Sequence, residues 1–201
     1  MGNKILYIII YMYVRASAAL PLRALYVLSD FLYLIIYYIA HYRRKVVRGN
    51  MQKSFPEKSE NELKKLERRF YHHFADYIIE TIKLAGMKQE ELLRRANIRN
   101  PELIYDLQDK GHTCFILMLG HYGNWEWFSG VGARFEGRSK IYQIYRPLTS
   151  KPFDKLFIYL RTRFNSIGIK KNEAVREMVR LKQNKTQALV PFVADQTPSR
   201  S

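Results

Sequence analysis

The sequence contains a single cysteine, Cys114, which excludes an internal disulfide framework and suits a reducing compartment. No group of cysteine and histidine residues has the spacing of metal ligands, so we expect no metal centre. Internal repeats, low-complexity segments and nucleic-acid-binding motifs are also missing from the sequence. At 201 residues, with 47% hydrophobic residues, the chain is long enough to bury the core of one domain.

Acidic residues are scarce, with 18 Asp and Glu against 34 Lys and Arg, and the formal net charge is +16. Such a balance implies an anionic partner: a nucleic acid, an anionic membrane surface, or an acidic protein or phosphorylated substrate. The 15 tyrosines and 11 phenylalanines are able to stack on bases. Many of these aromatics, however, lie in apolar runs near the N-terminus, where tyrosine at a membrane interface explains them better. We therefore expect no nucleic acid partner.

Two apolar segments open the chain, at residues 5–14 and 20–40. The first resembles the centre of a signal peptide, but Arg15 and the immediate start of the second segment argue against cleavage. The second is long enough to span a bilayer, yet Asp30 near its middle makes a lipid-exposed span costly. A helix lying in the membrane interface fits as well, and the alternative is a buried hairpin in a soluble core. The basic residues at 41–48 then mark the cytoplasmic side or attract anionic headgroups.

The rest of the chain alternates helical and strand patterns. Ser59 and Glu62 form a capping box, which predicts a helix ending near Gly86. The face of that helix expected to be buried is Leu63, Leu66, Phe70, Phe74, Tyr77 and Ile78. Strands are predicted at 114–119, 140–145 and 187–194, separated by helices. We predict an α/β fold with a mixed or mostly parallel sheet flanked by helices, preceded by an N-terminal membrane-associated helical segment. The corresponding domains are residues 1–48 and 49–201.

The chemistry is concentrated in residues 113–130, TCFILMLGHYGNWEWFSG. The apolar strand ends at Gly120, His121 follows it, and Asn124 is a suitable N-cap for a helix with Glu126 in its first turn. In an open α/β sheet, ligands bind at the carboxyl ends of the strands. The layout therefore predicts a histidine and a carboxylate at the ligand-binding edge.

A histidine beside a carboxylate favours general-base catalysis, because the carboxylate fixes the imidazole tautomer and stabilises the imidazolium. Five positions separate His121 from Glu126, which a turn can bring together. No serine or cysteine in the stretch is placed as a nucleophile, since Cys114 lies inside the apolar run. The nucleophile is then the substrate's own hydroxyl. The alternative is an ordinary surface pair at a helix start.

These residues resemble a known family. The segment from Gly120 to Glu126 is similar to the His-x-x-x-x-Asp/Glu motif of the lysophospholipid acyltransferase superfamily, and most similar to its lipid A biosynthesis lauroyl/myristoyl (late) acyltransferase branch. Residues 144–147 (IYRP) resemble the family's arginine motif, residues 190–198 (VPFVADQTP) its third block, and residues 28–56 its N-terminal region.

The resemblance implies transfer of a fatty acyl chain from a thioester on acyl carrier protein to a hydroxyl of a lipid A precursor, within lipopolysaccharide biosynthesis. It implies His121 as the base, Glu126 as the carboxylate that orients it, and Arg146 as a phosphate ligand. The substrate-binding residues implied are Asn124, Arg146, Asp195 and Gln196. The partners implied are acyl carrier protein, anionic inner-membrane lipids and the glycolipid acceptor, at the cytoplasmic face of the bacterial inner membrane. No cofactor is expected.

Two other functions are compatible with the same residues. One is a glycerolipid or lysophospholipid acyltransferase, and the other is a catalytically silent membrane-binding protein of the same fold. Members of the family usually continue well beyond the third block, and the strand at 187–194 is apolar enough to be central and to need neighbours on both sides. We therefore expect the acyltransferase domain to be incomplete at its C-terminus, poorly soluble without detergent and weakly active.

Overall fold

A computed structural model describes residues 2–135 and 137–196. By its internal contacts the chain divides into two compact units. The first, here called the sheet unit, comprises Met1–Tyr13 and Leu84–Ser201, and the second, the helical unit, is Val14–Lys83. Helix α1 (Gly2–Ala19) begins in the sheet unit and ends in the helical unit. The predicted domain boundary at residue 48 lies inside the helical unit.

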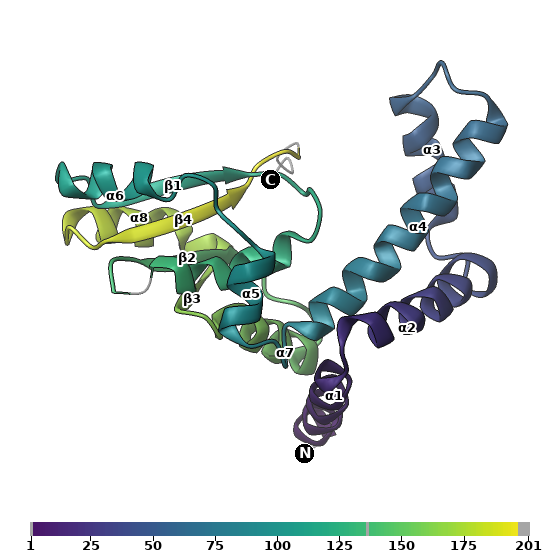
Figure 1. The fold of residues 1–201 in the computed structure, drawn as a ribbon, viewed down its shortest axis with the longest axis horizontal. Helices are drawn as coiled ribbons and strands as arrows, with labels where there is room; N and C mark the ends of the chain where they lie inside the picture. The colour runs from purple at the N-terminus through teal and green to yellow at the C-terminus, as the bar shows by residue number, and fades with distance from the viewer. Residues whose placement is uncertain (1, 136, 197–201) are drawn as a thin grey trace. The chain divides into compact units, whose positions relative to one another are not determined.

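The sheet unit contains a parallel sheet with the strand order β1-β4-β2-β3 (Figure 1). Its strands are β1 (Cys114–Leu119), β2 (Lys140–Tyr145), β3 (Ser166–Lys170) and β4 (Ala188–Val193). The prediction of a mostly parallel sheet flanked by helices is confirmed. Strand β4 lies between β1 and β2, as its apolar composition predicts, because a central parallel strand is covered on both faces.

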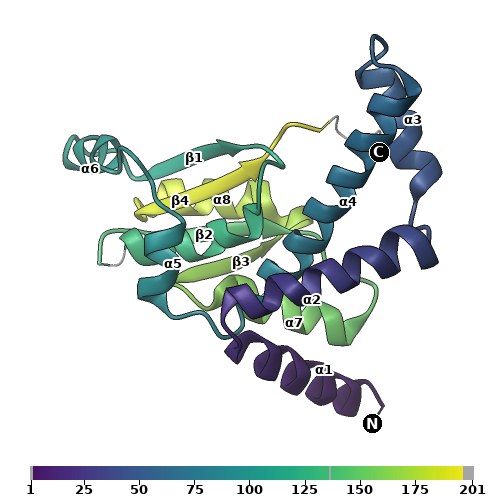
Figure 2. The same cartoon turned by 45° about the vertical axis from the view of Figure 1, so that its right-hand side comes forward.

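Helices cover both faces of this sheet (Figure 2). On one face, Val131 and Phe135 pack on Ile141 and Leu189. On the other face, Ala174 and Leu181 of helix α8 (Ala174–Gln183) join a cluster that contains Tyr142 and Val190. Neighbouring residues of β2 and β4 thus enter opposite cores, as the alternation of side chains along a strand requires.

Helices precede and separate the strands of the sheet unit. They are α5 (Gln89–Arg95), α6 (Glu102–Asp109), the 3₁₀-helix η2 (Trp125–Phe135), α7 (Lys151–Thr162), the short 3₁₀-helix η3 (Lys171–Glu173) and α8. Strand β3 was not predicted, because it has only five residues and Gly168 interrupts its apolar pattern. Gly132 in η2 leaves room for a backbone crossing, since a Cβ there would lie 2.4 Å from the carbonyl oxygen of Phe164.

The helical unit contains α2 (Leu22–Leu34), which continues as a π-helical turn, η1 (Ile35–Ile39), followed by α3 (Arg44–Ser54) and the long α4 (Glu60–Lys83) (Figure 1). The predicted capping box is confirmed. The Ser59 backbone N–H donates to the Glu62 carboxylate at 2.9 Å, and the Glu62 N–H donates to Ser59 Oγ at 3.4 Å. These two bonds satisfy donors that the helix leaves unpaired at its start.

The buried stripe of α4 differs from the predicted one. It comprises Leu63, Glu67, Tyr71, Ala75 and Ile79. Phe70, which was expected to be buried, is exposed and stacks on Phe74. The difference arises because Glu67 is buried although it is charged, and its carboxylate receives Arg44 at 2.9 Å and Arg48 at 3.1 Å. A pattern of apolar residues cannot predict the burial of a charged residue that is paired in this way.

One side of α2 contacts α4 through polar groups. Ser29 Oγ donates to Asp76 at 2.6 Å, and the Tyr26 hydroxyl donates to Glu80 at 2.8 Å. Asp30, the residue that made a lipid-exposed span costly, lies 3.6 Å from His72 Nδ1. The segment Leu22–Ile39 is long and apolar enough to cross a membrane, and only 28% of it is buried. An apolar N-terminal helix compatible with membrane association is therefore present.

Candidate active site

Three neighbouring strands bring the chemistry-bearing residues to one edge of the sheet. His121 follows β1 after Gly120, Arg146 follows β2 directly, and Asp195 comes two residues after β4. Because β1, β4 and β2 are adjacent and parallel, their carboxyl ends lie at the same edge. This is the edge at which parallel α/β sheets bind ligands.

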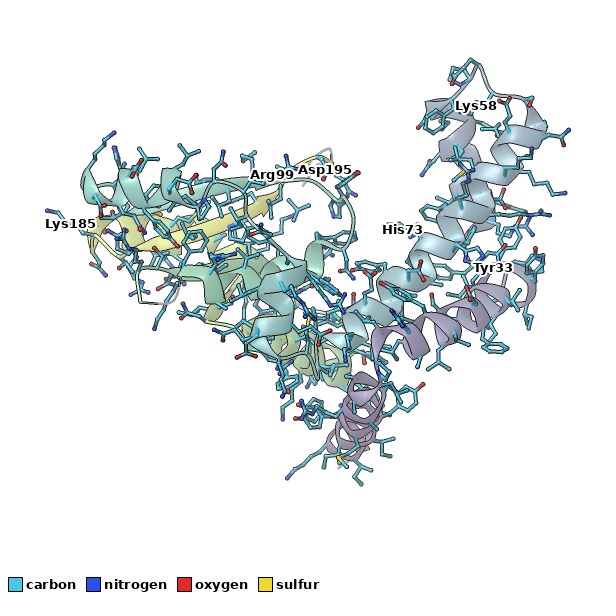
Figure 3. The ribbon with its side chains drawn as sticks, viewed as in Figure 1. Tyr33, Lys58, His73, Arg99, Lys185 and Asp195 are labelled. Carbon is cyan, nitrogen blue, oxygen red and sulfur yellow. The ribbon has the colours of Figure 1, made fainter. Side chains whose placement is uncertain are left out.

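Asp195 binds His121 twice. The His121 backbone N–H donates to Asp195 Oδ2 at 2.7 Å, and the ring atom Nδ1 lies 2.7 Å from Asp195 Oδ1. Figure 3 shows Asp195 just beyond the end of β4. Gly120 permits this approach, since a Cβ at that position would lie 3.3 Å from Asp195 Oδ2. The contact joins residues 74 positions apart in the sequence.

The two hydrogen bonds also set the charge of Asp195. The backbone N–H of His121, followed by its ring, lowers the pKa of the Asp195 carboxyl. The ionised carboxylate therefore contributes its full share of the folding stability above the ordinary aspartate pKa of about 4. That contribution is lost as the pH falls through the lowered pKa. At neutral pH an ionised Asp195 fixes Nδ1 of His121, which leaves Nε2 to accept a proton from a bound hydroxyl.

Glu126 has a different partner from the one predicted. Its carboxylate is buried, with 5% of the side chain exposed, and forms a two-point ion pair with the guanidinium of Arg161 on α7. The Arg161 Nε donates to Glu126 Oε2 at 2.8 Å. The predicted hydrogen bond between His121 and Glu126 is therefore wrong. A carboxylate buried in the apolar η2 segment requires a cation, and α7 supplies it.

Cys114 belongs to the core, as predicted. It packs against the cluster of buried residues under α8. Burial raises the pKa of its thiol, outweighing the opposing effect of Lys182. A thiol with a raised pKa is a poor nucleophile, since the thiolate is the reactive form.

A cavity of about 260 Å³ opens at this edge of the sheet, and it is lined by Trp125, a neighbour of His121, but not by His121 or Asp195. It is lined by Leu119, Trp125, Glu126, Phe128, Ser129, Gln143, Ile144, Tyr145, Arg146, Leu148, Arg161, Pro191 and Val193. The registered pairs between β2 and β4 end at Ile141 and Leu189, and Pro191, which has no N–H to donate, stands just beyond. The two strands are therefore free to separate where the cavity forms.

The lining of the cavity includes a ring that contacts His121 and two polar side chains. The ring of Trp125 meets the ring of His121 edge to face, with centroids 4.8 Å apart. The buried Nε2 of Gln143 has no hydrogen-bond partner among the described residues, so it is a donor available to a ligand. Arg146 is exposed at the rim and carries its charge into the same space.

The remaining predicted residues lie at the same edge. Asn124 precedes η2, and its carbonyl oxygen accepts the Trp127 N–H at 3.1 Å, so the helix starts where predicted. Gln196 is exposed next to Asp195. Sequence reasoning missed Arg161 and Gln143. A glutamate within the apolar WEWFSG segment was the available signal for Arg161, because a buried carboxylate needs a cation.

A search of curated proteins returns no matching sequence. The sequence model of the family described as bacterial lipid A biosynthesis acyltransferase matches residues 2–201. That match spans all the strands and both units. The chain therefore belongs to the bacterial lipid A biosynthesis acyltransferase family.

Proposed function

We propose that this protein transfers a fatty acyl chain from a thioester on acyl carrier protein to a hydroxyl group of a lipid A precursor. The observation that carries the proposal is the bond between His121 Nδ1 and Asp195 at the carboxyl edge of the sheet. Membership of the lipid A acyltransferase family supports the reaction class.

In the proposed reaction, His121 Nε2 removes the proton from the acceptor hydroxyl as its oxygen attacks the thioester carbonyl. The carbon–sulfur bond breaks, the ester forms, and the imidazolium returns its proton to the departing thiolate. Asp195 stabilises the imidazolium, a role that the sequence pattern assigned to Glu126. Glu126 instead fixes Arg161 in the cavity wall.

The acceptor is proposed to bind along the cavity. Arg146 provides a planar two-donor fork that suits a phosphate, and the Gln143 amide provides a buried donor. Asn124 and Gln196, at the same edge, complete the proposed acceptor contacts. The strongly basic chain suits an acidic carrier protein as donor. The apolar helices of residues 1–48 would place the enzyme on the cytoplasmic face of the bacterial inner membrane.

The test replaces His121 with alanine. In detergent, with acyl carrier protein thioester and a lipid A precursor, turnover should fall about 10²- to 10⁴-fold, because the general base is lost. The matched control is His73→Ala, an exposed histidine of α4, which should keep full turnover. Mass spectrometry of the product distinguishes lipid A acylation from glycerolipid acylation. Unchanged turnover in His121→Ala would overturn the proposed base.

A further inference from the structure

The helical unit contains a second cavity, of about 760 Å³, unrelated to the sheet edge. It is lined by His41, Arg43, Arg44, Lys45, Val46, Arg48, Lys64 and Glu67. Its volume lies in the range of small-molecule sites. Five of its lining residues are Lys or Arg, and one is acidic. The cavity is therefore suited to an anion.

Glu67 organises the arginines of this cavity. It is 3% exposed and receives Arg44 at 2.9 Å and Arg48 at 3.1 Å. The Arg44 guanidinium also lies 4.5 Å from the centre of the Tyr37 ring, and Arg48 reaches Glu60. These contacts fix both guanidinium groups while neutralising much of their charge. Arg44 and Arg48 therefore form a rigid wall of the cavity, here called the Glu67 frame, and their charge is largely compensated by protein carboxylates.

The free charge comes from three other residues. Arg43, Lys45 and Lys64 are exposed, and in the described part of the chain no carboxylate forms an ion pair with them. They converge on the cavity from the loop before α3, from α3 itself and from α4. Cations without a protein counter-ion around one cavity attract an anionic ligand.

The backbone at the cavity is also unusual. His41 and Arg43 have φ angles of 48° and 53°, in the left-handed region that residues other than glycine rarely adopt. The surrounding contacts maintain that conformation, since the Tyr71 hydroxyl donates to the Tyr42 carbonyl between them at 2.5 Å. The loop is thereby held in a conformation that turns these residues toward the cavity.

The chain that leads into the cavity is apolar and exposed. Ile39, which is 74% exposed, comes two residues before His41, and Phe31, Leu34, Ile35 and Tyr38 are exposed on the same helical segment. An acidic protein would use the charge but leave this apolar surface uncovered. A lipid uses both, because its headgroup is anionic and its acyl chains are apolar.

We propose that the Arg43–Lys45–Lys64 cavity binds the phosphate of an anionic phospholipid headgroup, while the exposed side of Leu22–Ile39 contacts the acyl chains. The proposal does not depend on the acyltransferase reaction. The cavity thereby specifies which lipids the protein associates with, in addition to the apolar helix that brings it to a bilayer.

The experiment is flotation of the full chain with phosphatidylcholine vesicles, with and without phosphatidylglycerol. The variant is Arg43→Ala/Lys45→Ala/Lys64→Ala, which leaves the buried Glu67 frame intact. Each lost charge should reduce partitioning into phosphatidylglycerol vesicles about 5-fold, and all three about 100-fold. Partitioning into plain phosphatidylcholine should be unchanged, because the apolar surface is retained.

Two controls separate a site from general charge. Lys110→Ala/Lys171→Ala/Lys182→Ala removes equal charge from exposed positions of the sheet unit and should leave the phosphatidylglycerol preference largely intact. Arg43→Lys/Lys45→Arg/Lys64→Arg keeps the charge and should retain binding. Equal losses in both alanine triples would overturn the proposal. So would an alanine triple at the cavity that keeps its lipid preference but loses acyl carrier protein. Turnover in detergent, which the cavity variant should retain, reports separately on the acyltransferase proposal.

Discussion

The site contains two carboxylates that differ in exposure, in position and in partner. Asp195 is partly exposed, follows a strand and contacts His121. Glu126 is buried, lies in a helix and contacts Arg161. A carboxylate hydrogen-bonded to a histidine ring stabilises the imidazolium whenever the ring gains a proton. A buried carboxylate in a two-point pair with arginine is fixed in charge and position, so it shapes the cavity instead.

The comparison also shows why spacing along the chain is a poor guide to contact. Glu126 is five positions from His121 and binds another helix, whereas Asp195 is 74 positions away and binds the ring. The cause is topological. Strand β4 returns between β1 and β2 and delivers the residues after it next to those after β1. A short sequence motif therefore predicts which residues lie at an edge of the sheet, but not which of them contact one another.

The largest effect on stability should come from breaking the buried pair. Glu126→Ala leaves the Arg161 guanidinium without its carboxylate, and loss of one partner of a buried pair costs about 3–5 kcal/mol. Because Arg161 retains some exposure, we expect the lower end, about 3 kcal/mol. The measurement is denaturant unfolding in detergent. Turnover at saturating substrate should fall only in proportion to the folded fraction.

The double variant Glu126→Met/Arg161→Met is the control for that loss. It removes both charges together, and an apolar replacement of a buried pair is often close to neutral. Most of the stability lost in Glu126→Ala should therefore return. If the double variant is as unstable as the single one, the pair is not the source of the loss. If Glu126→Ala is stable but inactive, Glu126 acts in the chemistry as the sequence pattern first indicated.

Most of the sheet unit was predictable because its strands have simple patterns. The strands predicted at 114–119 and 140–145 match the observed strands residue for residue. Strand β3 escaped because it is short and contains Gly168. The predicted site residues reach one edge because they lie in the segments that follow β1, β2 and β4, which is a local property of the sequence. Their pairing depends on strand order, which no local pattern contains.

The helical unit was less predictable for a different reason. The buried stripe of α4 includes Glu67, and its burial depends on two arginines from α3. A hydrophobic pattern assigns such a residue to the surface, so the predicted face was displaced toward Phe70 and Phe74. A similar error occurred at the active site, where Glu126 was predicted to contact His121 but is buried against Arg161. In both units, buried ion pairs caused the errors.

The second prediction concerns the exposed carboxylate. Asp195→Asn retains the shape and the acceptor for the His121 backbone N–H but loses the charge that stabilises the imidazolium. We expect kcat to fall about 10²-fold, less than the ~10⁴-fold known for a buried triad aspartate, because Asp195 is partly exposed. Stability should be nearly unchanged. Asp109→Asn, an exposed aspartate paired with Arg138 at 3.3 Å, is the matched control and should retain full kcat.

The smallest effect should come from Arg146→Lys at the rim of the cavity. Lysine keeps the charge but lacks the planar fork, so one of two hydrogen bonds to a phosphate is lost. A hydrogen bond to a charged group contributes about 1.5 kcal/mol, which predicts an acceptor KM raised about 10-fold with kcat nearly constant. Steady-state kinetics with the acceptor varied at saturating acyl donor measures this, and Arg138→Lys on the exposed surface is the control. An unchanged acceptor KM would remove Arg146 from phosphate binding. A fall in kcat alone would mean that Arg146 makes its contact only in the transition state, close to the charge that develops as His121 takes the proton.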